Sequence, residues 1–165
     1  MELIFKLLSD AIFFNLIREQ RYMLFISGLG ISLQLTLFAA ILGVVIGLFV
    51  AIIKLTNLKF LNRIASVYVD VIRGTPAVVQ LVIIYYAILG SSNLPKLLVA
   101  SIAFGINSGA YVSELIRAGI LAVDKGQMEA ARSLGFSYAS SMRYIIIPQA
   151  IKNILPALVN EIIVL

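Results

Sequence analysis

The sequence predicts an all-α integral membrane protein with several spans, and three features support this. The chain of 165 residues is 61% hydrophobic and only 13% charged, whereas soluble domains carry about 25% charged residues. The run from Tyr22 to Ile53 contains no charge and exceeds the ~20 residues that a transmembrane helix needs. Further apolar segments alternate with short basic or turn-rich links, as in a multi-span helical bundle.

The composition also excludes several kinds of function. The chain has no cysteine and no histidine, which excludes disulfides and thiolate or imidazole metal sites and argues against an enzyme. The net charge of +5 fits the lysine and arginine excess of cytoplasmic loops. We expect no nucleic-acid partner, because the basic residues are scattered between apolar segments. Residues 1–21 have no signal-peptide cleavage pattern.

The N-terminal part divides into a mixed segment and a long span. Residues 1–21 combine both charge signs with large apolar residues, which predicts an amphipathic helix on the membrane surface or against a partner. The first span follows within a transmembrane domain covering 22–165. Small residues recur every four positions along this span and predict a close helix–helix contact: Ala39, Gly43, Gly47 and Ala51.

The second span is predicted to be broken. The basic link 54–63 is typical of a cytoplasmic loop, and the segment from Ile64 to Leu89 is long enough to cross the membrane only if it includes Pro76. We expect this proline to kink the helix or to start a new one with Thr75 as N-cap. Asp70 and Arg73 lie three residues apart and are expected to pair. Residues 90–96 form a turn-rich external loop.

The third span is predicted over about 97–119, running inward, and a fourth apolar segment begins at Ala150. The basic residues agree with this topology except in the N-terminal segment, where they fall outside. The chain stops within the fourth segment without a flanking charge or cap, and we expect a truncated chain.

Between these segments, residues 124–148 are too polar for hydrocarbon and predict two short exposed helices. The first ends at Gly135, which suits the left-handed C-cap position, and Ser137 suits the N-cap of the second. Pro148 is expected to limit or bend that second helix. The physical reading leaves two alternatives, a docking surface for a soluble protein or an ordered loop without a partner.

Several polar residues lie inside the apolar segments and are candidates for a translocation path. A charged group in the membrane usually faces an interior or a wet cavity, which favours this role for Glu161. Asn107 and Glu114 are seven residues apart on roughly one helix face, although Arg117 offers Glu114 an alternative partner. Two carboxylates would suit a cationic or zwitterionic amino acid. The predicted substrate-binding residues are Asn107, Ser108, Glu114, Asn160 and Glu161.

The polar stretch resembles a known motif. The residues with fixed spacing are Glu129-Ala130-Ala131, then Gly135 after three residues, Ile145 after nine more, and Ile147-Pro148 after one more. This spacing is similar to that of the EAA loop of ABC-importer permeases, with Ile147 in place of the usual leucine. The stretches GAYVSELIRAGILAVDKGQMEAARSLG and VIRGTPAVVQLVIIYY resemble the polar amino-acid uptake branch of that family, and the resemblance covers about residues 22–165.

The resemblance implies a fold and a set of partners. The family's type I importer fold has five spans, and this chain ends in the fourth. The resemblance implies a multi-pass protein of the cell (inner) membrane that imports a polar amino acid and works with a second permease subunit, identical or related, and an extracellular binding protein. Its EAA loop would dock on cytoplasmic ATPase subunits through Glu129, Ala130, Ala131, Gly135, Phe136 and Ser137.

No phosphate-binding Gly-x-x-x-x-Gly-Lys-Ser/Thr motif occurs in the sequence, so we expect no cofactor here, with ATP and Mg bound by the partner. Two rival functions stay open. An ion-coupled secondary amino-acid transporter would use Glu114 and Glu161 as proton or cation sites, and a non-transporting membrane scaffold would bind no solute.

Overall fold

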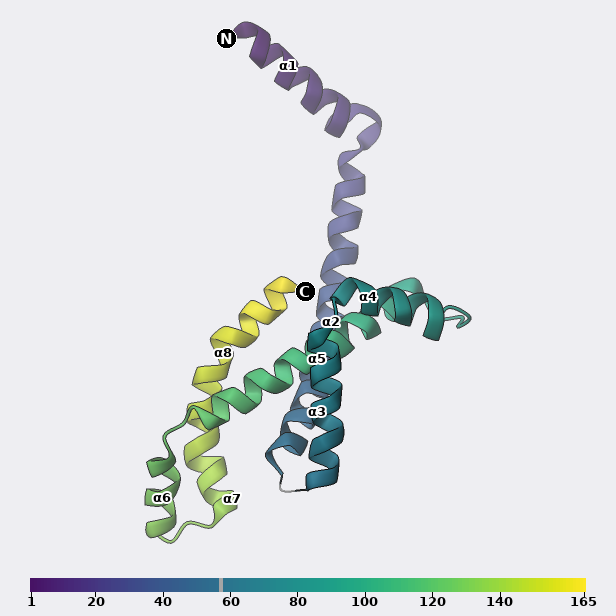
Figure 1. The fold of residues 1–165 in the computed structure, drawn as a ribbon. Coiled ribbons are helices and arrows are strands. Elements are labelled where there is room, and N and C mark those ends of the chain that lie inside the picture. Colours follow the sequence, from purple (N-terminus) through teal and green to yellow (C-terminus); the bar gives the residue numbers. More distant parts are fainter. Residues whose placement is uncertain (57) are drawn as a thin grey trace. The chain divides into compact units, whose positions relative to one another are not determined.

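The computed structural model describes residues 1–56 and 58–165, and these residues form helices without any strand. They divide into two compact units, Met1–Leu35 and Thr36–Leu165. Figure 1 shows the helices in chain order. The predicted all-helical fold is confirmed.

The N-terminal unit contains α1 (Glu2–Ile12), a π-helical turn η1 (Phe13–Ile17) and a 3₁₀ turn η2 (Arg18–Gln20). Glu19 and Gln20 have positive φ angles of 58° and 55°, a conformation that interrupts a right-handed helix. Helix α2 (Tyr22–Leu55) begins directly after this turn, where the uncharged run starts in the sequence.

Small residues hold α2 against α5 (Lys96–Leu121) in the second unit. The buried residues of α2 are the predicted stripe of Ala39, Gly43, Gly47 and Ala51. A Cβ atom added to Gly43 would lie 2.8 Å from Ser108 Oγ, and one added to Gly47 would lie 2.6 Å from Val112 Cγ1. The two backbones can approach this closely only because the side chains are absent, which confirms the predicted seam.

The predicted break in the next segment is also present. Helix α3 (Lys59–Gly74) ends before Pro76, and α4 (Ala77–Val82) continues into the π-helical turn η3 (Ile83–Ile88) at an angle of 108° to α3. Pro76 itself occupies the N-cap of α4. The prediction of Thr75 as N-cap was wrong, because its hydroxyl donates back to the Val71 carbonyl of α3 at 2.9 Å.

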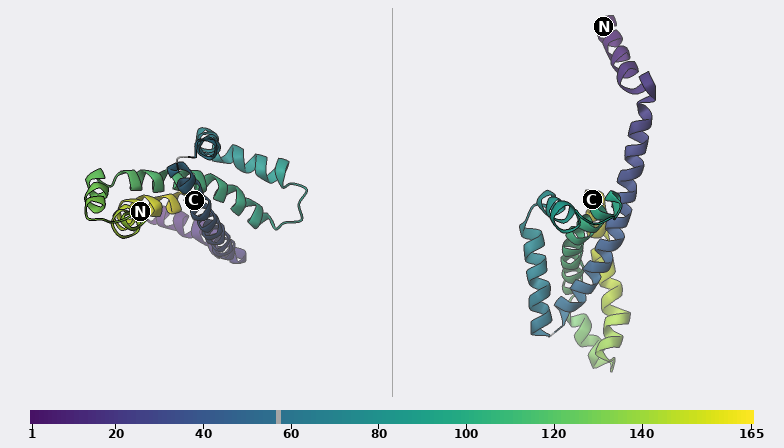
Figure 2. Two further views of the ribbon diagram at one scale, coloured as in Figure 1. Left: turned by 90° about the horizontal axis from the view of Figure 1, so that it is seen from below. Right: turned by 90° about the vertical axis from the view of Figure 1, so that its right-hand side faces the viewer.

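Helix α5 lies at the centre of the second unit. It packs along α8 (Ile147–Val164), and it also contacts α3 and α4; the pairing of α5 with α8 is seen in both orientations (Figure 1, Figure 2). Tyr68 of α3 donates its hydroxyl to the Ile106 carbonyl of α5 at 2.6 Å. The helices α6 (Lys125–Ser133) and α7 (Tyr138–Ser141) connect the far end of α5 to α8 through the π-helical turn η4 (Met142–Ile146).

By length and composition, the described residues contain two helices able to cross a membrane, α2 and α5. A third crossing exists if the bent pair of α3 with α4 and η3 is one span. Helix α8 is not among them: it carries Lys152, Asn153, Asn160 and Glu161, which dilute its apolar character. Its assignment as a span remains a prediction.

Candidate functional site

A cavity of about 270 Å³ lies where α4, α5 and α8 meet. Two of the predicted substrate-binding residues, Asn107 of α5 and Glu161 of α8, line it together. This is the arrangement that a helix bundle uses to build a small-molecule site, with a few polar groups in an apolar surround. The other lining residues are Ala77, Phe104, Tyr111, Val164 and Leu165.

Asn107 is held by a buried side chain from α4. Its Nδ2 donates to Gln80 Oε1 at 2.9 Å, and Gln80 is only 8% exposed. The Nε2 of Gln80 lies 2.6 Å from the Ile72 carbonyl, 3.0 Å from the Thr75 carbonyl and 2.6 Å from the Thr75 hydroxyl. These acceptors belong to the end of α3, so one amide joins both sides of the helix break to the cavity wall.

Glu161 shares its surroundings with a cation and a hydroxyl. The Ser108 hydroxyl and the Arg73 guanidinium lie near its carboxylate, and no ion pair within 4.0 Å joins Arg73 to Glu161. Arg73 also lies over the Tyr111 ring, 5.2 Å from its centroid, and Tyr111 lines the cavity. The predicted pair of Asp70 with Arg73 was wrong, since no ion pair joins them within 4.0 Å. The arginine reaches α5 instead.

Glu114 lies in a separate ionic cluster away from the cavity. Its Oε1 accepts from Lys54 Nζ at 2.5 Å, and its Oε2 accepts from Arg117 Nε and Nη2 at 3.1 and 2.8 Å. The Lys54 and Glu114 side chains are only 12% and 17% exposed, so the pair is largely removed from solvent and bridges α2 to α5. The structure does not bring Glu114 to Glu161.

The remaining predicted substrate residues also lie outside the cavity lining. Ser108 is buried and faces Gly43 of α2, and Asn160 is exposed on α8. In the part of the chain that the structure describes, no three His, Cys, Asp or Glu side chains are grouped closely enough to hold a metal ion.

The polar segment 124–148 begins as the sequence predicted. Asp124 caps α6 by accepting from the Gly126 N–H at 2.7 Å. Gly135 has a φ of +87°, and the Phe136 and Gly135 N–H groups donate to the Ala131 and Arg132 carbonyls at 3.1 and 3.0 Å. This pair of bonds is a Schellman motif, and it confirms Gly135 as the left-handed cap.

The second half of the segment also has the predicted start. Ser137 Oγ accepts from the Ser140 N–H at 3.1 Å, which confirms it as the N-cap of α7. Pro148, however, does not end the helix. Helices α7, η4 and α8 follow one another directly from Tyr138 to Val164, and the wider π-helical turn before Pro148 accommodates a residue that has no N–H to donate.

An apolar cluster fixes this segment on the membrane helices. Val123, Ile146 and Ala150 are buried together, and Met128 of α6 packs against them. Ala131 is 1% exposed, whereas Leu134 and Tyr138 on either side of the turn are 78% and 63% exposed. The segment therefore has one face anchored and one face open. The other residues predicted to dock on an ATPase also lie on the exposed side: Glu129, Ala130, Gly135, Phe136 and Ser137.

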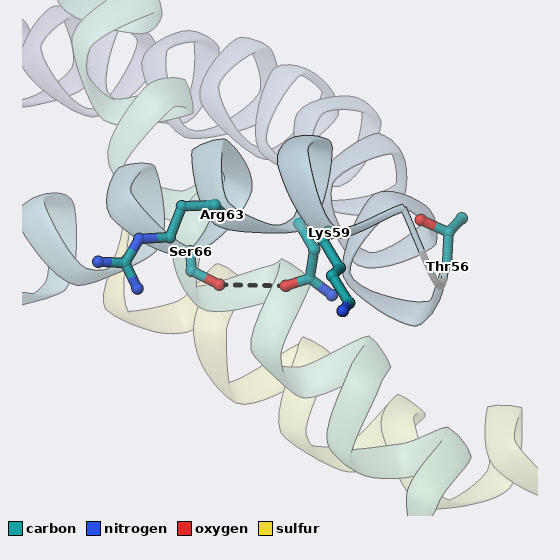
Figure 3. Close-up of a pocket in the computed structure, with 5 residues that line it drawn as sticks. Thr56, Lys59, Arg63 and Ser66 are labelled. Atoms are coloured by element: carbon teal, nitrogen blue, oxygen red, sulfur yellow. Dashed lines mark hydrogen bonds between the residues drawn. The ribbon is translucent and has the colours of Figure 1, made fainter.

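A second, larger and more open cavity of about 640 Å³ lies beside the α2–α3 link (Figure 3). It contains two cations, Lys59 and Arg63, and no acidic side chain. The Ser66 hydroxyl donates to Asn62 Oδ1 at 3.4 Å across this face. Its basic character fits a link on the cytoplasmic side. The lining residues are Thr56, Lys59, Asn62, Arg63 and Ser66.

Three residues at the first cavity were missed or misread in the sequence. Gln80 had a signal: a polar side chain in an apolar segment must find partners, and it follows the proline break by one turn. Tyr111 lies one turn beyond Asn107, on the same helix face. Arg73 was noticed, but its partner is on another helix, and residue spacing carries no information about that contact.

These features define a helical membrane protein with a small, mostly apolar cavity that contains two polar side chains, and with an exposed helical segment at one end. The family model described as "Binding-protein-dependent transport system inner membrane component" matches residues 43–165, and the chain belongs to this family. Together with the amino-acid permeases named below, this match confirms the resemblance to amino-acid permeases of ABC transporters. This is a family of membrane-embedded transport subunits rather than of enzymes.

Named relatives include permeases of amino-acid systems. The chain is 44% identical over 142 residues to the "Arginine transport system permease protein ArtQ" of Bacillus subtilis (strain 168), which covers 85% of this chain and 65% of that protein. It is 46% identical to the "Putative glutamine transport system permease protein GlnP" of Rickettsia felis, covering 84% of this chain and 64% of the relative. The chain thus spans just under two thirds of the length of these relatives.

A solved structure is also similar. It is described as the crystal structure of an amino acid ABC transporter with histidines, and the two chains share 56% sequence identity with a TM-score of 0.82. The match covers 87% of this chain and 67% of the other.

Proposed function

We propose that the chain is the membrane-spanning subunit of an ATP-driven importer and that it binds a polar amino acid, with a cationic one favoured, in the cavity between α4, α5 and α8. The observation that carries this is the meeting of Asn107 and Glu161 in that cavity. The names of the relatives, which refer to arginine, glutamine and histidines, support an amino acid as the ligand.

The groups around the cavity suit both ends of an amino acid. The Glu161 carboxylate would accept hydrogen bonds from an ammonium, guanidinium or imidazolium group, and such charge-assisted bonds are the strong ones. Arg73 does not itself line the cavity, but it lies over the ring of Tyr111, which does. From there it would reach the α-carboxylate, because a guanidinium pairs with carboxylates in a bidentate manner. Ser108 and Asn160 do not line the cavity and have no direct role in this proposal.

Residues 124–148 would dock on cytoplasmic ATPase subunits, which hold ATP and Mg. The exposed Leu134 and Tyr138 beside the Gly135 turn offer apolar anchors of the kind that protein interfaces use. Helices α7, η4 and α8 continue without a break from this surface to Glu161. A displacement of the docked end would therefore reach the cavity along a single helix.

The complete transporter would contain a second permease subunit, identical or homologous, and an extracellular substrate-binding protein. The chain itself would cross the cell (inner) membrane several times. The ion-coupled alternative has less support. It needs Glu114 and Glu161 as proton or cation sites, but Glu114 already has Lys54 and Arg117 as partners.

The test is the Glu161→Gln substitution, which keeps the size of the side chain and removes its charge. Losing a charge-assisted hydrogen bond of about 1.5–3 kcal/mol would weaken binding of labelled arginine or histidine roughly 10- to 150-fold. Binding is measured on the transporter assembled with its ATPase subunits. Asp70→Asn is the matched control, because Asp70 is exposed on α3 and does not line the cavity. Unchanged affinity of an intact Glu161→Gln complex would remove the residue from the site.

A further inference from the structure

The hydrogen bonds of Gln80 determine its own orientation. Its amide lies against the Ile72 and Thr75 carbonyls and the Thr75 hydroxyl. Carbonyl oxygens only accept hydrogen bonds, and the Thr75 hydroxyl donates its own proton to Val71. All three groups are therefore acceptors that share the two N–H donors of the Gln80 NH₂, and Gln80 Oε1 must point the other way, toward Asn107.

This orientation determines that of Asn107 in turn. An oxygen facing Asn107 can be satisfied only by a donor, so Asn107 presents Nδ2, which lies 2.9 Å away. The usual ambiguity between the oxygen and nitrogen of a side-chain amide is thus removed by the two backbone carbonyls at the end of α3. Asn107 Oδ1 is turned away from Gln80.

Asn107 Oδ1 is available to a ligand. In residues 1–56 and 58–165 no hydrogen bond uses this oxygen, and no buried side-chain polar atom lacks a partner. Oδ1 is therefore accessible rather than sealed in the packing, and its residue lines the cavity with Glu161. Asn107 and Glu161 therefore both offer acceptors to the cavity, beside the Tyr111 hydroxyl, and this pair of acceptors favours a ligand group rich in N–H donors.

We propose that Gln80 is a positioning residue of the substrate site: it holds Asn107 as a hydrogen-bond acceptor and ties that orientation to the break between α3 and α4. This inference rests on the proposed function, since it concerns the same cavity. Gln80 does not line the cavity and acts only through Asn107. A change in the break that moved Ile72 or Thr75 would release Gln80 and allow the Asn107 amide to turn.

The test is a double-mutant cycle with labelled arginine as the probe, on the transporter assembled with its ATPase subunits. Gln80→Met keeps the length of the side chain and removes both hydrogen-bonding functions. We expect about three- to tenfold weaker binding, as for the loss of one ordered hydrogen bond. In an Asn107→Ala background the same Gln80→Met change should cause no further loss, because coupled residues are not additive.

A second variant reverses the sign of the effect. Asn107→Asp in the native background places a carboxylate against Gln80 Oε1, two acceptors facing each other. The double variant Asn107→Asp with Gln80→Met should bind arginine more tightly than Asn107→Asp alone, because methionine removes the repulsion between the two acceptors. A Gln80 with a merely structural role would lower affinity in every background, and additive losses in the cycle would overturn the proposal. If Gln80→Met fails to fold, Thr75→Val removes one acceptor and should give a smaller loss that also disappears with Asn107→Ala.

The two hypotheses fail in different ways. Absence of arginine and histidine binding by the native transporter would overturn the proposed function. Normal binding that weakens with Asn107→Ala, together with an independent effect of Gln80→Met, would overturn only the positioning role.

Discussion

Gly135 offers the sharpest test of the proposed coupling segment, through Gly135→Val. A Cβ at this position would meet no atom within 4 Å, so a substitution introduces no steric overlap with the rest of the protein. Its whole effect arises from the backbone, whose φ of +87° is unfavourable for residues with a side chain and most of all for β-branched ones.

The magnitude follows from this conformation. A non-glycine residue in the left-handed region costs about 1–2 kcal/mol, and valine lies at or above the upper end. A cost of this size changes the population of the turn by a factor of about 5–30. The Schellman bonds to Ala131 and Arg132 would be lost in that fraction, and the α6–α7 angle with them. The membrane helices would be unaffected.

The assay is substrate-stimulated ATP hydrolysis by the reconstituted transporter, with membrane insertion and subunit binding measured on the same preparation. Gly135→Asn is the matched control, because asparagine tolerates the left-handed region, and it should retain most of the stimulation. Gly135→Val should lose most of it. Full stimulation in the valine variant would refute the reasoning, because a strained turn could not then be part of the coupling surface.

Two further substitutions test the packing. Gly47→Leu should destabilise the protein by about 1–3 kcal/mol, because the added Cβ meets Val112. The control Gly30→Leu, whose Cβ meets nothing within 4 Å, should leave the thermal midpoint in detergent unchanged. Equal midpoints for the two variants would contradict the close contact of α2 with α5. Glu114→Gln should lower the free energy of unfolding by about 1–3 kcal/mol without changing arginine affinity, because it leaves two cations partly unpaired; weaker binding at unchanged stability would instead return Glu114 to the substrate path.

Local features of the fold were predictable because local chemistry determines them. The small-residue stripe on α2 follows from a four-residue period, and the cap at Gly135 follows from the conformational freedom of glycine. Ser137 as N-cap and the break at Pro76 have the same origin, a residue type whose preferred backbone or hydrogen bond is set within one turn of the chain. None of these needs knowledge of a distant segment.

Contacts between helices were harder to predict from the sequence. Arg73 was expected to pair with Asp70 one turn away, yet it lies over Tyr111 of another helix. Lys54, which holds Glu114, is sixty residues away from it in sequence. Such partners depend on how separate helices pack along one another, and the hydropathy pattern of the sequence does not determine that packing. Pro148 shows the same limit, since the π-helical turn before it depends on the packing of η4 and α6.

The separation of Glu114 from the cavity has a geometric cause. Seven residues make nearly two full helical turns, so Asn107 and Glu114 share one face of α5, as the sequence predicted. The same seven residues also advance about 10 Å along the axis at 1.5 Å per residue. Two residues on the same face of α5 can therefore lie at different positions along the helix axis. Glu161 and Arg73 lie at the depth of Asn107, whereas Lys54 and Arg117 lie at that of Glu114. A polar residue on the correct helix face belongs to a binding site only if its height along the helix also matches. Glu114 lies about 10 Å farther along α5 than Asn107, where Lys54 and Arg117 are its partners.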